Sequence, residues 1–334
     1  MKRYLLRTLL YLSPLLALLA YYCFIVDKEA LKGDLARLAQ KEFHYTHPPL
    51  DPSAPRTACR DVDVVDIAPR AADEWVVFGD SYTAEHPRRW PNCRWHQFMG
   101  GLLGKRIVVA GYFEEPLVEF LRALTYCPEA LSDTVILQSG ERLLVSRLCY
   151  LDFDNIDQPQ PSTKEPTKGR WRKVWRKTST QPIEYYKKQL GIDMPVGRMK
   201  LKRACFSVYP KELFFYKDDL QHPTEQEYTR ALENLRRLDS MAHACGKTIF
   251  FVAVPEKYTA YRQQIANQID TTKLALEAPC LFDSEPYFIN MLPLISSLVD
   301  SDLLDVYLPD DTHFSIPTAQ AVGQYVARRI SGQP

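Results

Sequence analysis

The chain has 334 residues, of which 46% are hydrophobic and 25% charged, and this usage excludes the compositional classes of disordered and fibrous proteins. The 42 lysines and arginines nearly balance 41 acidic residues, so a net charge of +1 implies no whole-protein attraction to nucleic acid. Once an N-terminal segment is set aside, the remaining length suits one domain with a substantial core.

Residues 4–26 form an apolar run that is long enough to cross a bilayer core of about 30 Å as a helix. Lys2 and Arg3 make its start basic, and the positive-inside tendency places that end in the cytoplasm. A cleaved signal peptide is the alternative, but no small-residue cleavage site precedes Asp27. We therefore predict a single-pass anchor over residues 1–26 in the inner membrane, with the rest of the chain in the periplasm.

Residues 27–58 are expected to form a juxtamembrane helix followed by a stiff linker. Leu31, Leu35 and Leu38 recur at helical spacing among charged residues, and prolines then crowd the segment up to Pro55. A globular body is predicted to follow, from residue 59 to residue 334.

Four short apolar runs in this body predict buried strands, at residues 75–78, 106–110, 134–138 and 248–254. Helical patterns lie between and after these runs, and the clearest occupy residues 224–245 and 317–330. Apolar strands that alternate with amphipathic helices predict an α/β fold, in which helices cover both faces of a parallel sheet.

Residues from about 152 to 203 break this pattern and are interpreted as an insertion, because they are rich in Gln, Pro, Thr and Lys. The basic stretch 168–177 within it contains two tryptophans. Three interpretations of this stretch stay open: a solvated cover helix, a groove wall that attracts an anionic polysaccharide, and a surface that touches lipid headgroups.

The cysteines and most histidines give no sign of a metal site. Eight cysteines lack the CxxC spacing of zinc sites, and in an oxidising compartment some of the seven outside the apolar run are expected to pair. His86, His96, His222 and His243 have no partner at metal-ligand spacing and are interpreted as surface or core residues. We predict neither a metal nor another cofactor.

Ser81 directly follows the first predicted strand, so it should lie at the carboxyl edge of the sheet, where open α/β sheets bind their ligands. A serine nucleophile needs a histidine base that a carboxylate orients. His313 stands just before the last predicted helix, with Asp311 and Asp310 close ahead of it. Gly-Asp-Ser alone is just as commonly a turn, but Gly111, after the second predicted strand, adds a backbone N–H at the same edge.

These residues resemble a known family. Gly-Asp-Ser-Tyr at 79–82, Gly111 and Asp-Thr-His-Phe-Ser at 311–315 resemble the SGNH (GDSL-type) hydrolase superfamily, and more closely its alginate O-acetylation branch, whose terminal motif also reads Asp-Thr-His-aromatic. Residues 138–144 are similar to that branch's Glu-Arg segment, and residues 254–261 to its Pro-x-Lys-x-x-x-Tyr segment, with the lysine at 257. The resemblance implies a three-layer sandwich around a flavodoxin-like parallel sheet.

The resemblance also implies roles for the site residues. Ser81 would be the nucleophile, His313 the base and Asp311 the orienting acid, whereas the Asp-x-x-His spacing of many superfamily members would select Asp310. The amides of Ser81 and Gly111 would bind the oxyanion.

The superfamily's third block normally supplies an asparagine to the oxyanion hole, but this chain has Glu141 and Arg142 at that place. The third donor is therefore open. Arg142 and Tyr82 are the candidates, and Arg142 is equally well interpreted as a structural ion-pair partner.

The function that the resemblance implies is a periplasmic O-acetyltransferase that acts on sugar hydroxyls of an exported polysaccharide. A membrane-bound acyltransferase would be the partner that supplies the acetyl group, and no nucleotide would be needed. Two alternatives remain: an esterase or polysaccharide deacetylase of the same fold, and a non-catalytic subunit that assists polysaccharide assembly.

Overall fold

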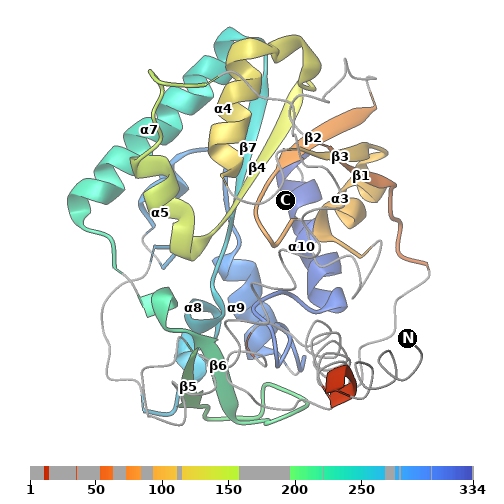
Figure 1. The fold of residues 1–334 in the computed structure, drawn as a ribbon, viewed down its shortest axis with the longest axis vertical. Coiled ribbons are helices and arrows are strands. Elements are labelled where there is room, and N and C mark those ends of the chain that lie inside the picture. The colour runs from red at the N-terminus through yellow and green to blue at the C-terminus, as the bar shows by residue number, and fades with distance from the viewer. Residues whose placement is uncertain are drawn as a thin grey trace.

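The computed structural model describes residues 11–14, 35, 53–62, 73–83, 93–110, 115–157, 196–220, 222–267, 275–277, 280–301 and 303–332. A six-stranded sheet in the order β1-β3-β2-β4-β7-β8 forms their centre (Figure 1), and all its strands are parallel. The strands are β1 (Cys59–Val62), β2 (Glu74–Phe78), β3 (Arg106–Ala110), β4 (Thr134–Gly140), β7 (Thr248–Val254) and β8 (Phe288–Asn290).

Successive residues of a strand point to opposite sides of the sheet, and the central strands are continuous apolar runs, so both faces of the sheet are apolar. Val77 of β2 belongs to one core cluster, and its neighbours Val76 and Phe78 belong to the other. Helices cover each face, so the chain has the predicted α/β architecture. The first face carries α3 (Trp95–Leu103), α9 (Leu292–Asp300) and α10 (Ile316–Ile330), and the second carries α4 (Pro116–Tyr126), α5 (Glu141–Cys149) and α7 (Glu225–Ala244).

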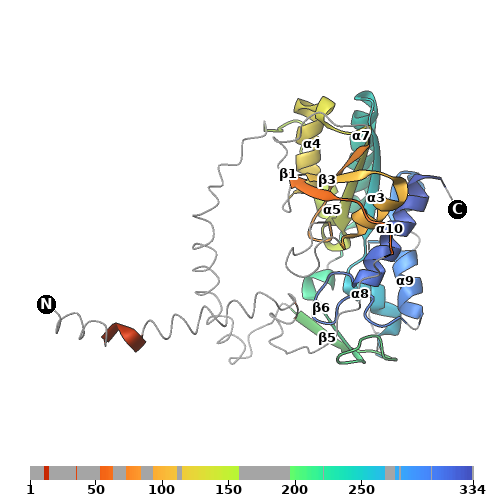
Figure 2. The same ribbon diagram turned by 90° about the vertical axis from the view of Figure 1, so that its right-hand side faces the viewer.

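Two helix pairs dominate these layers. Helix α3 lies against α10, and α5 lies against α7 (Figures 1 and 2). The start of α7 is fixed by a capping box, in which Glu227 N–H donates to Thr224 Oγ1 at 3.3 Å and Thr224 N–H donates to the Glu227 carboxylate at 2.7 Å. The predicted helices at 224–245 and 317–330 are confirmed.

The four predicted strands are confirmed as β2, β3, β4 and β7, and their order determines where a site can form. Strands β3 and β1 lie on one side of β2, while β4, β7 and β8 lie on the other side. The order β3-β2-β4-β7-β8 is compatible with a flavodoxin-like sheet. Its switch point lies between β2 and β4, and such sheets bind ligands outside the carboxyl ends of the strands at this point.

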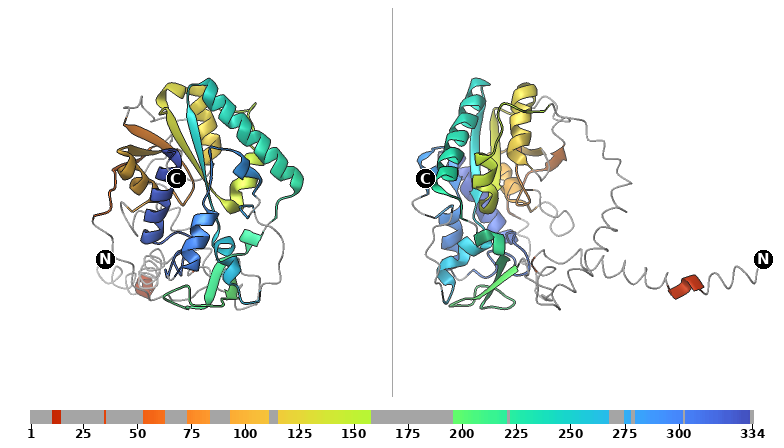
Figure 3. Two further views of the ribbon diagram at one scale, coloured as in Figure 1. Left: turned by 180° about the vertical axis from the view of Figure 1, so that it is seen from behind. Right: turned by 60° about the vertical axis from the view of Figure 1, so that its left-hand side comes forward.

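The predicted insertion contains a strand that the sequence did not indicate. Within it, β5 (Val196–Lys200) pairs antiparallel with β6 (Glu212–Tyr216), and this hairpin lies beyond the carboxyl ends of β4 and β7 (Figure 3). Residues of β5 are half-buried or exposed, so the strand lacks the apolar run by which the other strands are recognised. Residues 158–195, which include the basic stretch, lie outside the described residues.

Short helices complete the described part of the chain. They are α8 (Lys257–Tyr261), η2 (Pro128–Ala130), η3 (Lys217–Leu220), η4 (Arg262–Gln264) and η5 (Leu281–Ser284). Most of the predicted anchor and linker lies outside the described residues, although residues 11–14 are helical and β1 begins at Cys59, the start expected for the body. No described helix is both long and apolar enough to cross a membrane.

The expected pairing of cysteines is wrong for the described part of the chain, where none of the seven cysteines forms a disulfide bond. Other groups partner the sulfurs: Arg94 Nη1 lies 3.9 Å from Cys59 Sγ, and Cys280 Sγ donates to the Ala275 carbonyl at 3.3 Å. Burial raises the pKa of the Cys59 and Cys280 thiols to about 12, so both are protonated at neutral pH.

Candidate active site

Ser81 lies in an exposed turn directly after β2, next to the switch point of the sheet. Thr83 N–H donates to the Asp80 carbonyl at 3.0 Å and closes this turn. A side chain at Gly79 would not fit, because its Cβ would lie 2.2 Å from Thr83 Oγ1 and 2.7 Å from Gln138 Oε1. We call residues 79–83 the serine turn.

We expect Gly79→Ala to disrupt the serine turn, because the buried side chains of Thr83 and Gln138 occupy the place of the new methyl group. Overpacking of this kind typically costs about 1–3 kcal/mol of the free energy of unfolding. Chemical denaturation of the variant checks the loss, and Gly246→Ala is the contrasting glycine: nothing lies near its Cβ position, and its strain comes only from a φ of 70°. A Gly79→Ala protein with wild-type stability and a wild-type turn would contradict this packing.

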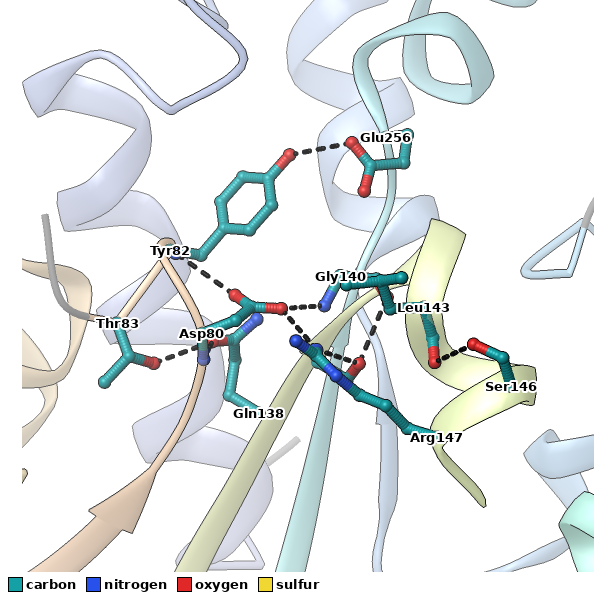
Figure 4. Close-up of polar contacts among 10 residues, drawn as sticks. Asp80, Tyr82, Thr83, Gln138, Gly140, Leu143, Ser146, Arg147 and Glu256 are labelled. Carbon is teal, nitrogen blue, oxygen red and sulfur yellow. Dashed lines mark hydrogen bonds and ion pairs between the residues drawn. The ribbon is translucent and has the colours of Figure 1, made fainter. Parts of the chain in front are cut away.

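The carboxylate of Asp80 points into the protein rather than toward solvent (Figure 4). Asp80 Oδ1 accepts a hydrogen bond from Tyr82 N at 3.2 Å, and Oδ2 accepts from Gly140 N at 2.8 Å and from Arg147 Nη1 at 2.7 Å. Arg147 also donates to Ser139 Oγ at 2.9 Å. This buried ion pair ties the serine turn to the end of β4 and to α5.

Two further side chains hold the turn. Gln138 Oε1 accepts from Asp80 N at 3.0 Å and from Thr83 Oγ1 at 2.8 Å. On the other side, His96 Nε2 of α3 lies 2.9 Å from the carbonyl of Thr83. A carbonyl only accepts, so Nε2 carries the proton. The sequence predicted His96 as a surface or core residue; it is fully buried, and its contact with the turn was missed because α3 lies beyond β2 in the chain.

His96 also makes the stability depend on pH. Burial lowers its pKa from 6.5 to about 3, so between these values the unfolded chain binds a proton that the folded protein excludes. The free energy of unfolding should therefore fall as the pH drops below about 6.5, by up to ~1.4 kcal/mol per pH unit. Denaturant titrations at pH 7, 6 and 5 measure this slope. In His96→Gln, the part of the pH dependence of the unfolding free energy that His96 causes should vanish. An unchanged pH dependence would contradict its assignment to His96.

Asp311 and His313 lie together in a loop before α10. His313 Nδ1 is 2.6 Å from Asp311 Oδ1, and the same oxygen accepts from the His313 backbone N–H at 3.3 Å. The carboxylate on Nδ1 is thus the one that the Asp-x-His spacing selects, and it orients the ring so that Nε2 is left on the opposite edge. We call residues 308–313 the histidine loop.

Lys257, at the start of α8, fixes the histidine loop from inside the protein. Its ammonium group is completely buried and donates to the carbonyls of Leu308 at 2.6 Å, Pro309 at 3.2 Å and Asp311 at 3.1 Å. It also lies 4.8 Å from the ring centre of Phe206. The sequence indicated Lys257 only as part of a segment similar to the family's; the structure shows it as an internal cation for the loop that carries the Asp311–His313 pair.

Tyr82 brings the serine turn and the histidine loop together, although they are 230 residues apart in the sequence. Its ring centre lies 5.2 Å from that of His313 and 5.3 Å from that of Phe314. Its hydroxyl contacts the carbonyl of Thr312 at 3.1 Å and Glu256 Oε2 at 3.3 Å. Ser81, the residue before Tyr82, therefore lies at the same sheet edge as the Asp311–His313 pair.

Among the described residues, no hydrogen bond joins Ser81 to His313. Catalytic hydrogen bonds are commonly long or unformed before substrate binds, so the missing hydrogen bond is compatible with Ser81 as nucleophile and His313 as its base. The arrangement offers an exposed hydroxyl on a rigid turn, beside an imidazole whose Nδ1 is held by a carboxylate. These are the groups that activate a serine for attack on a carbonyl carbon.

The expected oxyanion donors are less well supported. The Tyr82 hydroxyl is buried and its contacts go to Glu256 and Thr312 within the protein. Arg142 Nη1 pairs with Asp219 Oδ1 at 3.1 Å, and its guanidinium lies 4.8 Å from the ring centre of Tyr216. Of the two interpretations of Arg142, the structure thus supports the ion pair. Gly111 lies outside the described residues.

Glu141 is buried where the superfamily's asparagine was expected, and it serves the fold. Its Oε2 accepts from the backbone N–H of Glu256 at 3.1 Å, and its Oε1 accepts from that of Leu276 at 3.0 Å. Burial raises its pKa to about 7, against the opposing effect of these hydrogen bonds. Glu141 therefore joins the start of α5 to the segment after β7.

The other histidines follow the interpretation from sequence where they are described. His222 is exposed, and His243 on α7 contacts Asp239 Oδ1 at 3.2 Å, whereas His86 lies outside the described residues. Within the described ranges, no cluster of three or more His, Cys, Asp and Glu side chains is placed to hold a metal ion. In comparisons with known proteins, no family model, no curated protein and no solved structure matches the chain.

Proposed function

We propose that the protein is a serine-dependent acyltransferase that uses Ser81, His313 and Asp311. The observation that carries this proposal is the Asp311–His313 pair, with its 2.6 Å contact, beside the tyrosine that directly follows Ser81. The switch point of a parallel sheet is also where α/β enzymes place their ligands. Asp80, the other acid of the serine turn, supports the turn through Arg147 and takes no part in the chemistry.

In the proposed reaction, Ser81 Oγ attacks the carbonyl carbon of an acyl ester while His313 Nε2 takes the hydroxyl proton. Asp311 holds the imidazole tautomer and stabilises the imidazolium that forms. The tetrahedral intermediate collapses as His313 returns the proton to the leaving alcohol, which leaves an ester on Ser81. An acceptor hydroxyl then attacks this ester in the same way and regenerates the free serine.

The oxyanion of each tetrahedral intermediate needs hydrogen-bond donors. The backbone N–H groups of Ser81 and Gly111 take this role in the proposal, as the resemblance implies. One such donor is typically worth about 3–4 kcal/mol of the activation free energy, so the substitution of the usual asparagine by Glu141 matters. We place no third side-chain donor among the described residues, since Tyr82 and Arg142 have other partners.

The strand order supports the finer proposal of an SGNH-type sandwich, because Ser81 follows the central strand of a flavodoxin-like arrangement. Within that superfamily, the Asp-Thr-His-Phe motif and Lys257 favour the O-acetylation branch. The acyl group in the proposal is therefore acetyl, and the acceptor is a sugar hydroxyl of an exported polysaccharide. A membrane-bound acyltransferase is the proposed source of the acetyl group.

The proposed location is the periplasmic side of the inner membrane, with the N-terminal run as anchor. It rests on the apolar residues 4–26 and their basic start. Alkaline phosphatase fused after Pro55 is expected to be active, because that enzyme needs an oxidising compartment. An inactive fusion, together with an active cytoplasmic reporter at the same position, would reverse the topology.

The transferase proposal is tested by the fate of the acetyl group. Purified protein receives an activated acetyl ester and oligosaccharides of differing charge, and acetylated sugar is counted against free acetate, with Ser81→Ala as the blank. We expect sugar acetylation to exceed hydrolysis for at least one acceptor class. If acetate dominates with every acceptor and acetylated oligosaccharides are stripped, the protein is a deacetylating esterase.

A further inference from the structure

The Tyr82 hydroxyl has one proton but contacts two oxygen atoms (Figure 4 shows the contact with Glu256). The Thr312 carbonyl can only accept, so Tyr82 must donate its proton there at 3.1 Å. The second contact, 3.3 Å to Glu256 Oε2, then becomes a hydrogen bond only if Glu256 donates. An ionised Glu256 would instead compete with Thr312 for the tyrosine proton. A protonated Glu256 gives each contact its own proton, whereas an ionised Glu256 leaves both acceptors to share the single tyrosine proton.

Charged and titratable groups surround Glu256 on several elements. They are Asp80 and Tyr82 after β2, Glu141 and Arg142 at the start of α5, Asp219 in η3, Lys257 at the start of α8, and Tyr307 in the segment before α10.

The cations near Glu256 are already engaged. Arg142 pairs with Asp219, Arg147 pairs with Asp80, and the Lys257 ammonium donates to three carbonyls of the histidine loop. Glu256 itself is 3% exposed, and no salt bridge joins its side chain to a cation within the described ranges, although Arg142 is the charged group that acts on it most strongly. A buried carboxyl group without an ion-pair partner is stabilised more by a proton than by a charge.

The electrostatic surroundings agree with this geometry. Burial raises the pKa of Glu256, Arg142 acts in the opposite direction, and Asp80 adds to the rise, so the pKa is raised overall. The backbone N–H of Arg142 also donates to the Glu256 carboxyl group. One carboxyl group that accepts from Arg142 and donates to Tyr82 has the hydrogen-bonding pattern of a neutral acid or of an amide.

We propose that Glu256 is protonated in the active protein and, through Tyr82, is a positioning residue that holds the histidine loop against the serine turn. Its part in catalysis rests on the function proposed above. Lys257 binds three carbonyls of the loop from the same short segment, so Glu256 and Lys257 together fix the distance between Ser81 and His313. Deprotonation of Glu256 would draw the tyrosine proton away from Thr312 and loosen one side of this attachment.

The test compares kcat as a function of pH in the full chain, with a small acetyl ester as substrate. Glu256→Gln keeps an acceptor for Arg142 and supplies a permanent donor to Tyr82. We expect it to retain activity and to lose the decline at high pH that deprotonation of Glu256 causes in the wild type. Tyr82→Phe keeps the ring against His313 but lacks the hydroxyl, so kcat should fall by about 10- to 100-fold. Adding Glu256→Gln to it should change nothing further.

Glu141→Gln is the matched control, because this neighbouring buried glutamate accepts backbone hydrogen bonds on both oxygens. An amide there would direct an N–H against another N–H, so the variant should be less stable and should keep the high-pH decline. The proposal is wrong if Glu256→Gln shows the same decline as the wild type, or if its kcat falls as far as that of Tyr82→Phe.

A second readout needs no catalysis and separates this proposal from the proposed function. Carbon-13 NMR of the Glu256 carboxyl group follows its titration, and amide exchange at His313, whose N–H donates to Asp311, follows the order of the loop. We expect exchange to quicken as Glu256 deprotonates and to be fast at all pH values in Tyr82→Phe. If these results hold but Ser81 never acylates, only the proposed function fails. A Glu256 that is ionised at pH 5, or loop exchange that ignores its titration, overturns the positioning role.

Discussion

Ser81→Ala is expected to lower the turnover of a chromogenic acetyl ester by about 10⁴- to 10⁶-fold, to the level that binding alone supports. The loss is this large because Ser81 Oγ is the atom that forms the ester bond of the acyl-enzyme. No other hydroxyl of the serine turn is exposed. His313→Ala should cost nearly as much. Combining the two changes should add little, because residues of one triad act as a unit. Initial rates with purified proteins measure each step.

Ser146→Ala is the matched control for this prediction. Ser146 is also exposed and belongs to α5, and its hydroxyl donates to the Leu143 carbonyl at 3.1 Å (Figure 4). It should keep wild-type turnover. If Ser81→Ala is as active as Ser146→Ala while both proteins are folded, the nucleophile is another residue. If the wild type itself lacks turnover, the non-catalytic assembly subunit becomes the better proposal.

Asp311→Asn is expected to lower kcat by about 10⁴-fold, whereas Asp310→Asn should lower it far less. Asp311 Oδ1 lies 2.6 Å from His313 Nδ1, and an amide at that place favours the wrong imidazole tautomer. The two aspartates are adjacent and both buried, so Asp310→Asn reproduces the loss of a buried charge without touching this contact. The measurement is kcat for both variants, with thermal unfolding to verify that each is folded.

The reverse ranking would place the protein with the Asp-x-x-His members of the superfamily, and it would contradict the Asp311–His313 geometry. If both variants unfold and lose all activity, their activities are compared again at a lower temperature at which both are folded. There the Asp311→Asn protein should show the slower acylation of Ser81.

The sequence predicted the frame of the site well because the signals for that frame are local. Runs of apolar residues that end in glycine located β2 and β3, and Ser81 follows from its place after β2. Asp311 and His313 are two residues apart, so they had to lie in the same loop. Strand β8, with three residues, was missed because such a run is too short to show a period.

The contacts that hold the site residues in place could not be predicted from the sequence, because each contact joins segments that are far apart in the chain. Asp80 and Arg147 are 67 residues apart, and Tyr82 and Glu256 are 174 residues apart. No local pattern indicates that an aspartate in a Gly-Asp-Ser turn faces inward to an arginine. For the same reason Tyr82 and Arg142 were both candidates for the third oxyanion donor, with a structural ion pair as the equal alternative for Arg142, although the fold gives both of them other partners.

The central claim is that Ser81 forms an acyl-enzyme, and intact-protein mass spectrometry after exposure to an activated acetyl ester tests it most directly. The account predicts a mass increase of one acetyl group, located on the peptide that contains Ser81, absent from Ser81→Ala and strongly slowed in His313→Ala. An unmodified wild-type protein, or acetylation that persists in Ser81→Ala at the wild-type rate, would contradict it.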